Sequence, residues 1–75
     1  MSYSLRTDAA VKDTNDYPTL SRATKAAKVL SDITCQEVLI MNNVTGKEIG
    51  RVYNAWRDKL GHLHRQRTFI YDKEG

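Results

Sequence analysis

The sequence predicts a small α+β domain in which one or two helices pack on a small, mostly antiparallel sheet. Residues 19–32 have helical periodicity, whereas residues 36–42 and 65–72 are short runs rich in apolar or β-forming side chains. The chain has 75 residues, and a chain of this length buries only about 60% of the surface that its unfolded state exposes. We therefore expect one small core, and a homo-oligomer would add to its stability.

The first eighteen residues are expected to form an extended or mobile arm, and residues 19–75 the single small domain. Residues 1–18 are polar and poorly periodic, although residues 2–6 suit a short edge strand. The segment 13–18 has turn chemistry, because Asp and Asn side chains bond nearby backbone groups and Pro18 disfavours a helical residue before it. This N-terminal segment is expected to end at Pro18.

A helix is predicted over residues 19–32. Its apolar residues recur at steps of three and four, which places them on one face, and its alanine content favours a helix intrinsically. Thr19 or Ser21 can cap its N-terminus. The apolar face consists of Leu20, Ala23, Ala27 and Leu30.

Residues 36–42 suit either a buried strand or a short buried helix. Thr34 and Glu37 have the spacing of a helix capping box. The run is only seven residues long and contains four consecutive apolar residues, which favours a strand.

Residues 43–60 also allow two interpretations. Asn43 followed by Gly46 suits a hairpin with a type I turn and a glycine bulge. Thr45 and Glu48 have capping-box spacing instead, and six later apolar residues would fall within about 100° on a helix. This stripe outweighs the roughly 1 kcal/mol that a glycine at position 50 costs a helix, so we favour a helix over 46–60. The six residues are Ile49, Val52, Tyr53, Trp56, Leu60 and Leu63.

The predicted helix over 46–60 permits an alternative fold, a helix-turn-helix with a C-terminal strand. Its first helix would be 35–42 and its turn Asn43, since Asn tolerates a left-handed backbone. The closing strand is 65–72, which is rich in β formers. If the hairpin forms instead, residues 47–56 join the sheet and the class stays α+β.

Charge is the main indication of function. Residues 1–43 carry five basic and five acidic residues, whereas 44–75 carry seven basic and four acidic ones, so the net charge of +3 lies in the second half. A local basic block beside a neutral half indicates an anionic partner, nucleic acid first. The predicted contact residues are Lys47, Arg51, Arg57, Lys59, Arg65 and Arg67.

Other side chains in the basic block have two interpretations. Tyr53 and Trp56 have helical spacing with Ile49 and Leu60 and are expected to belong to the core, and the alternative is that they stack on unpaired bases. Asn54 and Gln66 would read base edges if their element entered a groove.

No motif for catalysis or for cofactor binding is visible. His62 and His64 form a single close pair, whereas a zinc site needs three or four ligands. Cys35 adjoins an apolar run and has no nucleophile signature around it, so it is expected to be structural. We therefore expect a non-enzymatic protein without metal or cofactor.

Two hypotheses for function remain. The first is a small basic nucleic-acid-binding or regulatory protein that uses residues 47–67 as its anion-facing surface. The second is a protein-binding modulator, an inhibitor or adaptor of the kind that viruses and mobile elements encode, which docks on a larger partner protein. A lone cysteine, the absence of an apolar run of roughly 20 residues and the absence of an export signal predict a cytoplasmic protein without a membrane partner.

Overall fold

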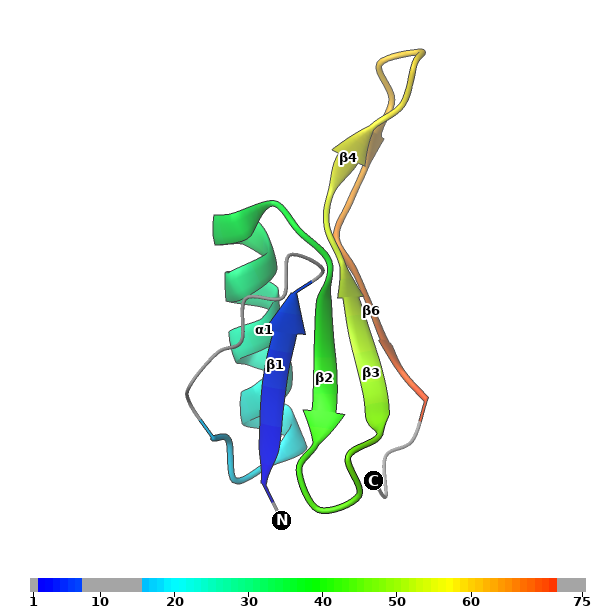
Figure 1. Ribbon diagram of the computed structural model, residues 1–75. Helices are drawn as coiled ribbons and strands as arrows, with labels where there is room; N and C mark the ends of the chain where they lie inside the picture. The colour runs from blue at the N-terminus through cyan, green and yellow to red at the C-terminus, as the bar shows by residue number, and fades with distance from the viewer. Residues whose placement is uncertain (1, 8–15, 72–75) are drawn as a thin grey trace.

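The computed structural model describes residues 2–7 and 16–71, and statements about structure refer to these residues. It confirms the α+β class, with one helix on a four-stranded antiparallel sheet and a second, two-stranded sheet (Figure 1). The helix-turn-helix alternative is wrong, because residues 38–42 and 48–53 are strands. In chain order the elements are β1 (Tyr3–Thr7), α1 (Leu20–Thr34), β2 (Val38–Asn42), β3 (Glu48–Tyr53), β4 (Trp56–Arg57), β5 (Leu63–His64) and β6 (Arg67–Ile70).

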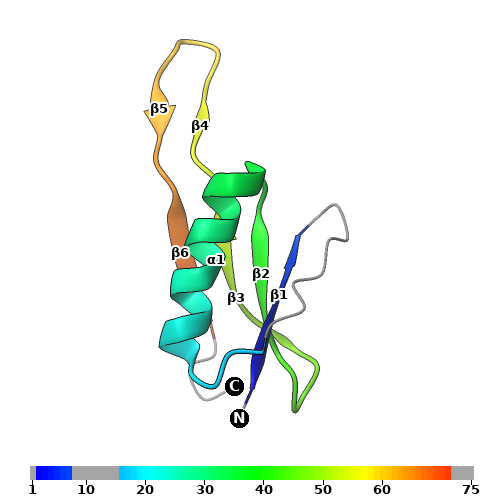
Figure 2. The ribbon, with the colours of Figure 1, turned by 90° about the vertical axis from the view of Figure 1, so that its left-hand side faces the viewer.

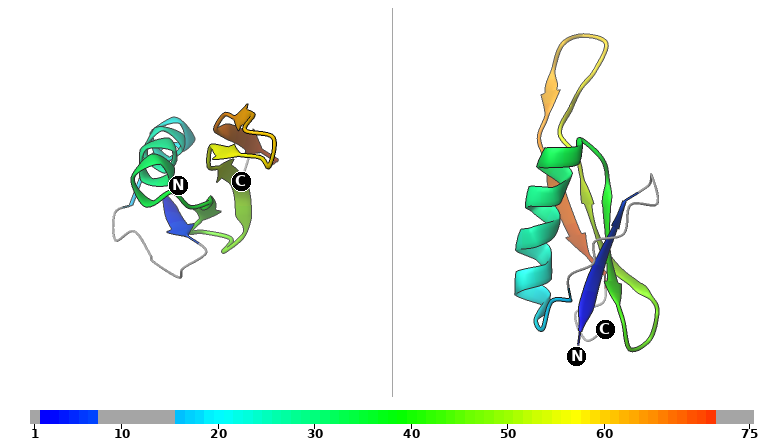
Figure 3. Two further views of the ribbon diagram at one scale, coloured as in Figure 1. Left: turned by 90° about the horizontal axis from the view of Figure 1, so that it is seen from above. Right: turned by 60° about the vertical axis from the view of Figure 1, so that its left-hand side comes forward.

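The four-stranded sheet has the order β1-β2-β3-β6, and every neighbouring pair is antiparallel. Helix α1 lies along one face of this sheet (Figure 2). The view from above shows the helix and the sheet as two layers (Figure 3). Within the described part of the chain no helix covers the opposite face, which we call the open face.

The first strand, β1, forms one edge of the sheet, as the pattern of residues 2–6 suggested. Backbone hydrogen bonds between Tyr3 and Tyr17, 2.9 Å in each direction, tie the segment before α1 to this edge. Part of the segment predicted as an N-terminal arm is thus hydrogen-bonded to the sheet. Residues 8–15 lie outside the described residues.

The predicted helix is confirmed, and α1 runs two residues further than expected. The Thr19 hydroxyl accepts a hydrogen bond from the Arg22 amide at 3.2 Å, which caps the N-terminus. Ala23 and Ala27 are fully buried against the sheet. Because their side chains are single methyl groups, the helix backbone can lie close to the strands.

The core lies between α1 and the sheet. One row across the sheet joins Leu5, Ile40, Gly50 and Ile70 on the helix side. At Gly50 the side chain of Ile70 occupies the space that a larger residue would fill. The buried apolar residues are Tyr3, Leu5, Ala23, Ala27, Val38, Ile40, Ile49 and Val52.

The helix predicted over 46–60 does not form, because residues 42–47 make a hairpin turn. The Asn42 side-chain oxygen accepts from the Val44 amide at 2.8 Å, and its backbone oxygen accepts from the Gly46 amide at 2.8 Å. Gly46 has a φ of +72°, which favours glycine. The Glu48 carboxylate, which was expected to complete a capping box with Thr45, binds Arg51 and Tyr71 instead.

A β-bulge explains why β3 did not look like a strand in the sequence. Ile40 lies opposite Gly50 and Met41 opposite Glu48, which leaves Ile49 as the extra residue of the bulge. The bulge breaks the simple alternation, so that both Ile49 and Val52 are buried although they are three residues apart.

Beyond β3 the chain continues as a hairpin that projects past the end of α1 and returns into β6 (Figure 1). We call residues 54–66 the arm. It contains the short strands β4 and β5, in which Trp56 pairs with His64 and Arg57 with Leu63. The arm helps to make the molecule elongated, with principal extents of 42 × 22 × 17 Å.

Replacing Cys35 with glycine is expected to stabilise the fold by about 0.5–1 kcal/mol. Cys35 ends α1 with a φ of 54°, and this left-handed backbone costs a non-glycine residue roughly 1–2 kcal/mol. Glycine would avoid this cost, but its greater conformational freedom in the unfolded chain offsets about half of the resulting stabilisation. Urea denaturation measures the change, and Cys35→Ser serves as the control because it removes the exposed thiol but keeps the strain. An equal gain in both variants would contradict the backbone explanation.

Candidate functional site

The structure separates the six basic residues predicted to form one surface. Lys47 lies in the turn between β2 and β3, at the opposite end of the molecule from the tip of the arm (Figure 1). Arg51 lies on the open face and forms ion pairs with two carboxylates. Arg57 and Lys59 lie on the outer part of the arm, Arg65 near its base, and Arg67 begins β6. Four of the six residues therefore form one basic region. We call these four residues the arm cations: Arg57, Lys59, Arg65 and Arg67.

Arg51 is held by two carboxylates. Its Nη1 lies 2.6 Å from Glu37 Oε1 and its Nη2 lies 2.8 Å from Glu48 Oε1. The hydrogen bond that Arg51 donates to Glu48 raises the pKa of Arg51, and the same bond lowers the pKa of Glu48. The Tyr71 hydroxyl donates to Glu48 Oε2 at 2.5 Å. Arg51 thus has its charge balanced inside the protein and is poorly suited to bind a phosphate.

The arm cations differ from Arg51 because no carboxylate pairs with them among residues 2–7 and 16–71. All four side chains belong to exposed residues. Arg57 donates to the backbone oxygen of Gly61 at 3.1 Å, which leaves its charge unbalanced. Residues 54–67 contain these four basic residues and Asp58 as the only acidic one. The arm therefore carries a concentrated positive charge.

Asp58 organises the tip of the arm. Its Oδ1 accepts hydrogen bonds from the amides of Leu60 and His62, both at 2.9 Å. The backbone closes the turn through a Gly61 amide bond to the Asp58 oxygen at 3.0 Å, and Gly61 has a φ of +83°. The only carboxylate of the arm is thus used inside the turn and does not neutralise the cations.

Hydrogen bonds also hold Asp58 in its charged form. The bond from His64, followed by the backbone amide bonds, lowers the pKa of Asp58 below its ordinary value. A carboxyl group whose pKa is lower in the folded state stabilises that state above its unfolded pKa. This stabilisation of the turn is lost as the pH falls through the lowered pKa, so the turn is fully stabilised at neutral pH.

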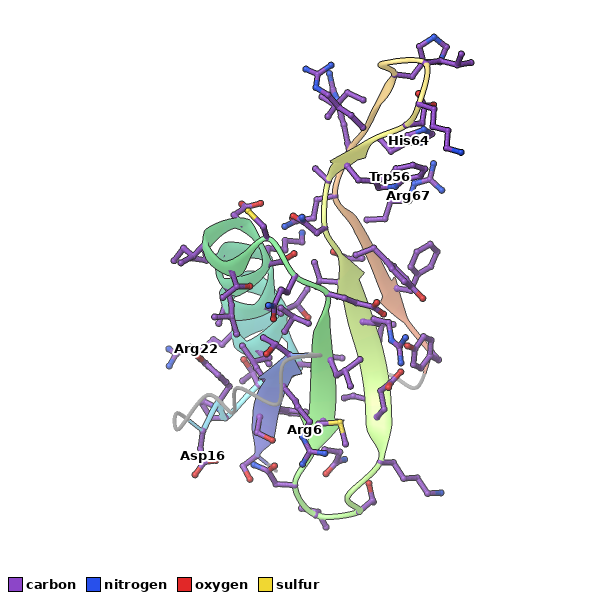
Figure 4. The ribbon with its side chains drawn as sticks, turned by 45° about the horizontal axis from the view of Figure 1, so that its top comes forward. Arg6, Asp16, Arg22, Trp56, His64 and Arg67 are labelled. Atoms are coloured by element: carbon purple, nitrogen blue, oxygen red, sulfur yellow. The ribbon has the colours of Figure 1, made fainter. Side chains whose placement is uncertain are left out.

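Trp56 and His64 form a stacked pair on one face of the arm. Their ring centroids are 4.2 Å apart and the ring planes differ by 10°. His64 Nε2 in turn lies 3.0 Å from Asp58 Oδ2. Figure 4 shows Trp56, His64 and Arg67 close together, with Arg22 in a different region of the molecule. The indole ring is thus fixed by the histidine, and the histidine by the aspartate.

Gln66 anchors the base of the arm to the helix. Its Nε2 donates to the Lys28 backbone oxygen at 2.9 Å and to Asp32 Oδ1 at 3.0 Å. Both amide hydrogens are therefore engaged with α1. The sequence suggested that Gln66 would read base edges, whereas its amide group in this structure positions the arm.

Tyr53 and Trp56 were predicted as core residues, and this prediction is wrong. Tyr53 is 40% exposed and Trp56 is 56% exposed. The core assignment depended on a helix, whereas β3 places Tyr53 on the open face. There it packs edge to face with Phe69 of β6, with ring centroids 5.5 Å apart. Exposed aromatic rings therefore extend from the sheet to the arm.

A pocket of about 360 Å³ lies where the open face meets the arm. Aromatic rings, an amide side chain and two arginines surround it, so that apolar surface lies next to positive charge. Its lining residues are Tyr53, Asn54, Trp56, His64, Arg65, Arg67 and Phe69.

The described residues contain neither a metal site nor a membrane-spanning helix, and Cys35 is not buried in the core. Among the described residues no group of three or more His, Cys, Asp or Glu side chains is arranged to hold a metal ion. Cys35 is exposed at the end of α1, so it is not part of the core as its neighbours in sequence suggested. The one helix in the described ranges is too short and too polar to cross a membrane.

Comparisons with protein-family models, with curated proteins and with solved structures find no match to this chain. What the protein binds therefore has to be inferred from the arm, the open face and the pocket between them.

Proposed function

We propose that the protein is a small, non-enzymatic nucleic-acid-binding protein and that the arm with the adjoining part of the open face is its binding surface. The arm cations carry this proposal, since no described carboxylate pairs with them and two of them, Arg65 and Arg67, line a pocket together with exposed aromatic rings. Lys47 and Arg51, which the sequence grouped with them, are left out of the surface. The first is distant from the arm, and the second is paired with Glu37 and Glu48.

The chemistry of this surface suits a polyanion. Lysine and arginine side chains that contact phosphates release counterions, which favours binding in a way that depends steeply on salt. Exposed aromatic rings add stacking contacts with bases. Because the arm projects from the sheet, a strand of nucleic acid can reach the arm cations without meeting the helix.

Fluorescence anisotropy of labelled DNA and RNA oligomers, titrated with the protein, tests the proposal. We expect binding with a dissociation constant of micromolar or tighter at low salt, with a logarithmic salt slope that reflects about three or four phosphate contacts. Binding that remains measurable at about 150 mM salt would support a functional surface. No binding to any oligomer at low salt would contradict the proposal.

A protein-binding modulator remains the second candidate, and one observation favours it. Leu60 at the tip of the arm is 81% exposed and Leu63 is 55% exposed. Exposed apolar residues on a projecting element are typical of a contact with another protein. On this hypothesis Leu60→Ala would abolish binding to the partner, whereas single substitutions of the arm cations would mainly slow association. Surface plasmon resonance against a candidate partner separates the two effects.

A further inference from the structure

We infer that the pocket between the open face and the arm receives an unpaired base, so that the protein selects single-stranded over duplex nucleic acid. This inference rests on the proposed function and specifies its substrate. It concerns the pocket described above, with its aromatic lining and its two arginines, Arg65 and Arg67.

The size and lining of the pocket suit a flat aromatic ligand. Its volume of about 360 Å³ lies at the lower end of the range of small-molecule sites, about 300–1,000 Å³. The edge-to-face pair of Tyr53 and Phe69 belongs to the sheet side, and Trp56 belongs to the arm side. A base that enters between them can stack on an aromatic ring, which every base allows because each has a π face.

The ring of Trp56 is held in place before any ligand arrives. His64 covers one face of the indole, and Asp58 fixes the histidine ring at 3.0 Å. The tryptophan nevertheless stays 56% exposed. A ring that is already oriented loses little freedom when a base stacks on it, which favours binding.

Charge at the pocket matches the phosphates that accompany a base. Arg65 and Arg67 both line the pocket and are exposed, and neither is paired with a carboxylate in the described ranges. The half-buried Asn54 lies in the same lining and carries the donors and acceptor that a base edge requires. Aromatic rings flanked by arginines bind a base and its phosphates together.

A duplex does not satisfy this arrangement. Its bases are stacked on their neighbours, so that their faces are closed to the rings of Trp56, Tyr53 and Phe69. A duplex would reach the arm cations through its phosphates alone, whereas a single strand offers phosphates and unstacked bases.

Trp56 is the only tryptophan of the chain, so its fluorescence reports directly on the pocket. We would titrate the protein with oligothymidylate, with an abasic oligomer of equal length and charge, and with a duplex of equal length. Each titration would be followed by tryptophan fluorescence and by anisotropy of the labelled oligomer. We expect oligothymidylate to quench Trp56 and to bind at least about tenfold more tightly than the abasic oligomer.

Variants locate the effect. Trp56→Leu should remove the preference for oligothymidylate over the abasic oligomer, and Trp56→Phe should restore most of it. Val29→Ala is the matched control, because Val29 is 57% exposed, close to the exposure of Trp56, but lies on α1 outside the proposed binding surface. Circular dichroism would confirm that each variant keeps the fold.

The outcomes separate this inference from the proposed function. Equal affinity for all three oligomers, with no quenching, would overturn the base pocket and leave a protein that binds phosphates alone. Anisotropy that stays flat with every oligomer would overturn the proposed function itself. A loss of preference in Val29→Ala equal to that in Trp56→Leu would also overturn the assignment of the pocket.

Discussion

Replacing Gly50 with alanine is expected to lower the free energy of unfolding by about 1–3 kcal/mol, the cost of overpacking a core. A methyl group at this position would lie 2.7 Å from Ile70 Cδ1 and 2.9 Å from the Phe69 backbone oxygen. The first contact can be relieved by a side-chain movement, whereas the second requires a shift of β6. Thermal unfolding followed by circular dichroism should show a melting temperature lower by roughly 4–8 °C for each kcal/mol.

A second substitution separates the two contacts. Ile70→Val removes the Cδ1 atom and should cost about 0.5–1.5 kcal/mol when it is made alone. If the contact with Ile70 contributes to the cost of Gly50→Ala, the double variant should lose less stability than the two single variants together. A Gly50→Ala protein as stable as the original would contradict the close packing between β3 and β6 at this point.

The parts of the fold that could be predicted from the sequence are those in which local pattern and tertiary structure agree. Helix α1 has a regular apolar face and a capping threonine, and it forms as expected. Strand β2 is a short buried run, and β6 falls inside the predicted strand 65–72. Helix α1 buries every fourth residue and β2 every second one, and β6 alternates between exposed and half-buried side chains, as each element requires.

The helix predicted over 46–60 was wrong because three local features of the region 43–60 make a long hairpin difficult to recognise in the sequence. The bulge at Ile49 breaks the alternation of buried and exposed residues in β3. The turn at Gly46 overlaps a capping-box spacing, and the exposed aromatic residues have the spacing of an apolar helix face. A sequence pattern assumes that apolar residues are buried. On the arm this assumption does not hold, because Trp56, Leu60 and Leu63 are all exposed.

The candidate site could be predicted only in part for the same reason. Four of the six basic residues do gather in one region, the arm and the start of β6, as their density in the sequence suggested. Arg51 pairs with Glu48 on the same strand and with Glu37 just before β2, and the second pair depends on the β2–β3 hairpin, which was not the favoured prediction. The roles of Asp58 and His64 depend on a turn that was not predicted, although the run Asp58–Gly61 has the composition of one.

Reversing the charge of two arm cations, in the double variant Arg65→Glu/Arg67→Glu, is expected to weaken nucleic-acid binding by on the order of a hundredfold at low salt, about tenfold for each arginine. Both residues line the pocket, and no described carboxylate balances their charge. The logarithmic salt slope for a single strand should fall by about 1.4, because each lost phosphate contact removes roughly 0.7. Anisotropy titrations at several salt concentrations measure both quantities.

The matched control is Arg22→Glu/Lys25→Glu, which changes the net charge of the protein by the same amount. Arg22 and Lys25 are exposed on α1, and Figure 4 shows Arg22 apart from the residues of the arm. If the surface acts through its position, the control should weaken binding only slightly and keep the salt slope. If both double variants weaken binding equally, the arm cations act through net charge alone, and the assignment of the binding surface to the arm is wrong.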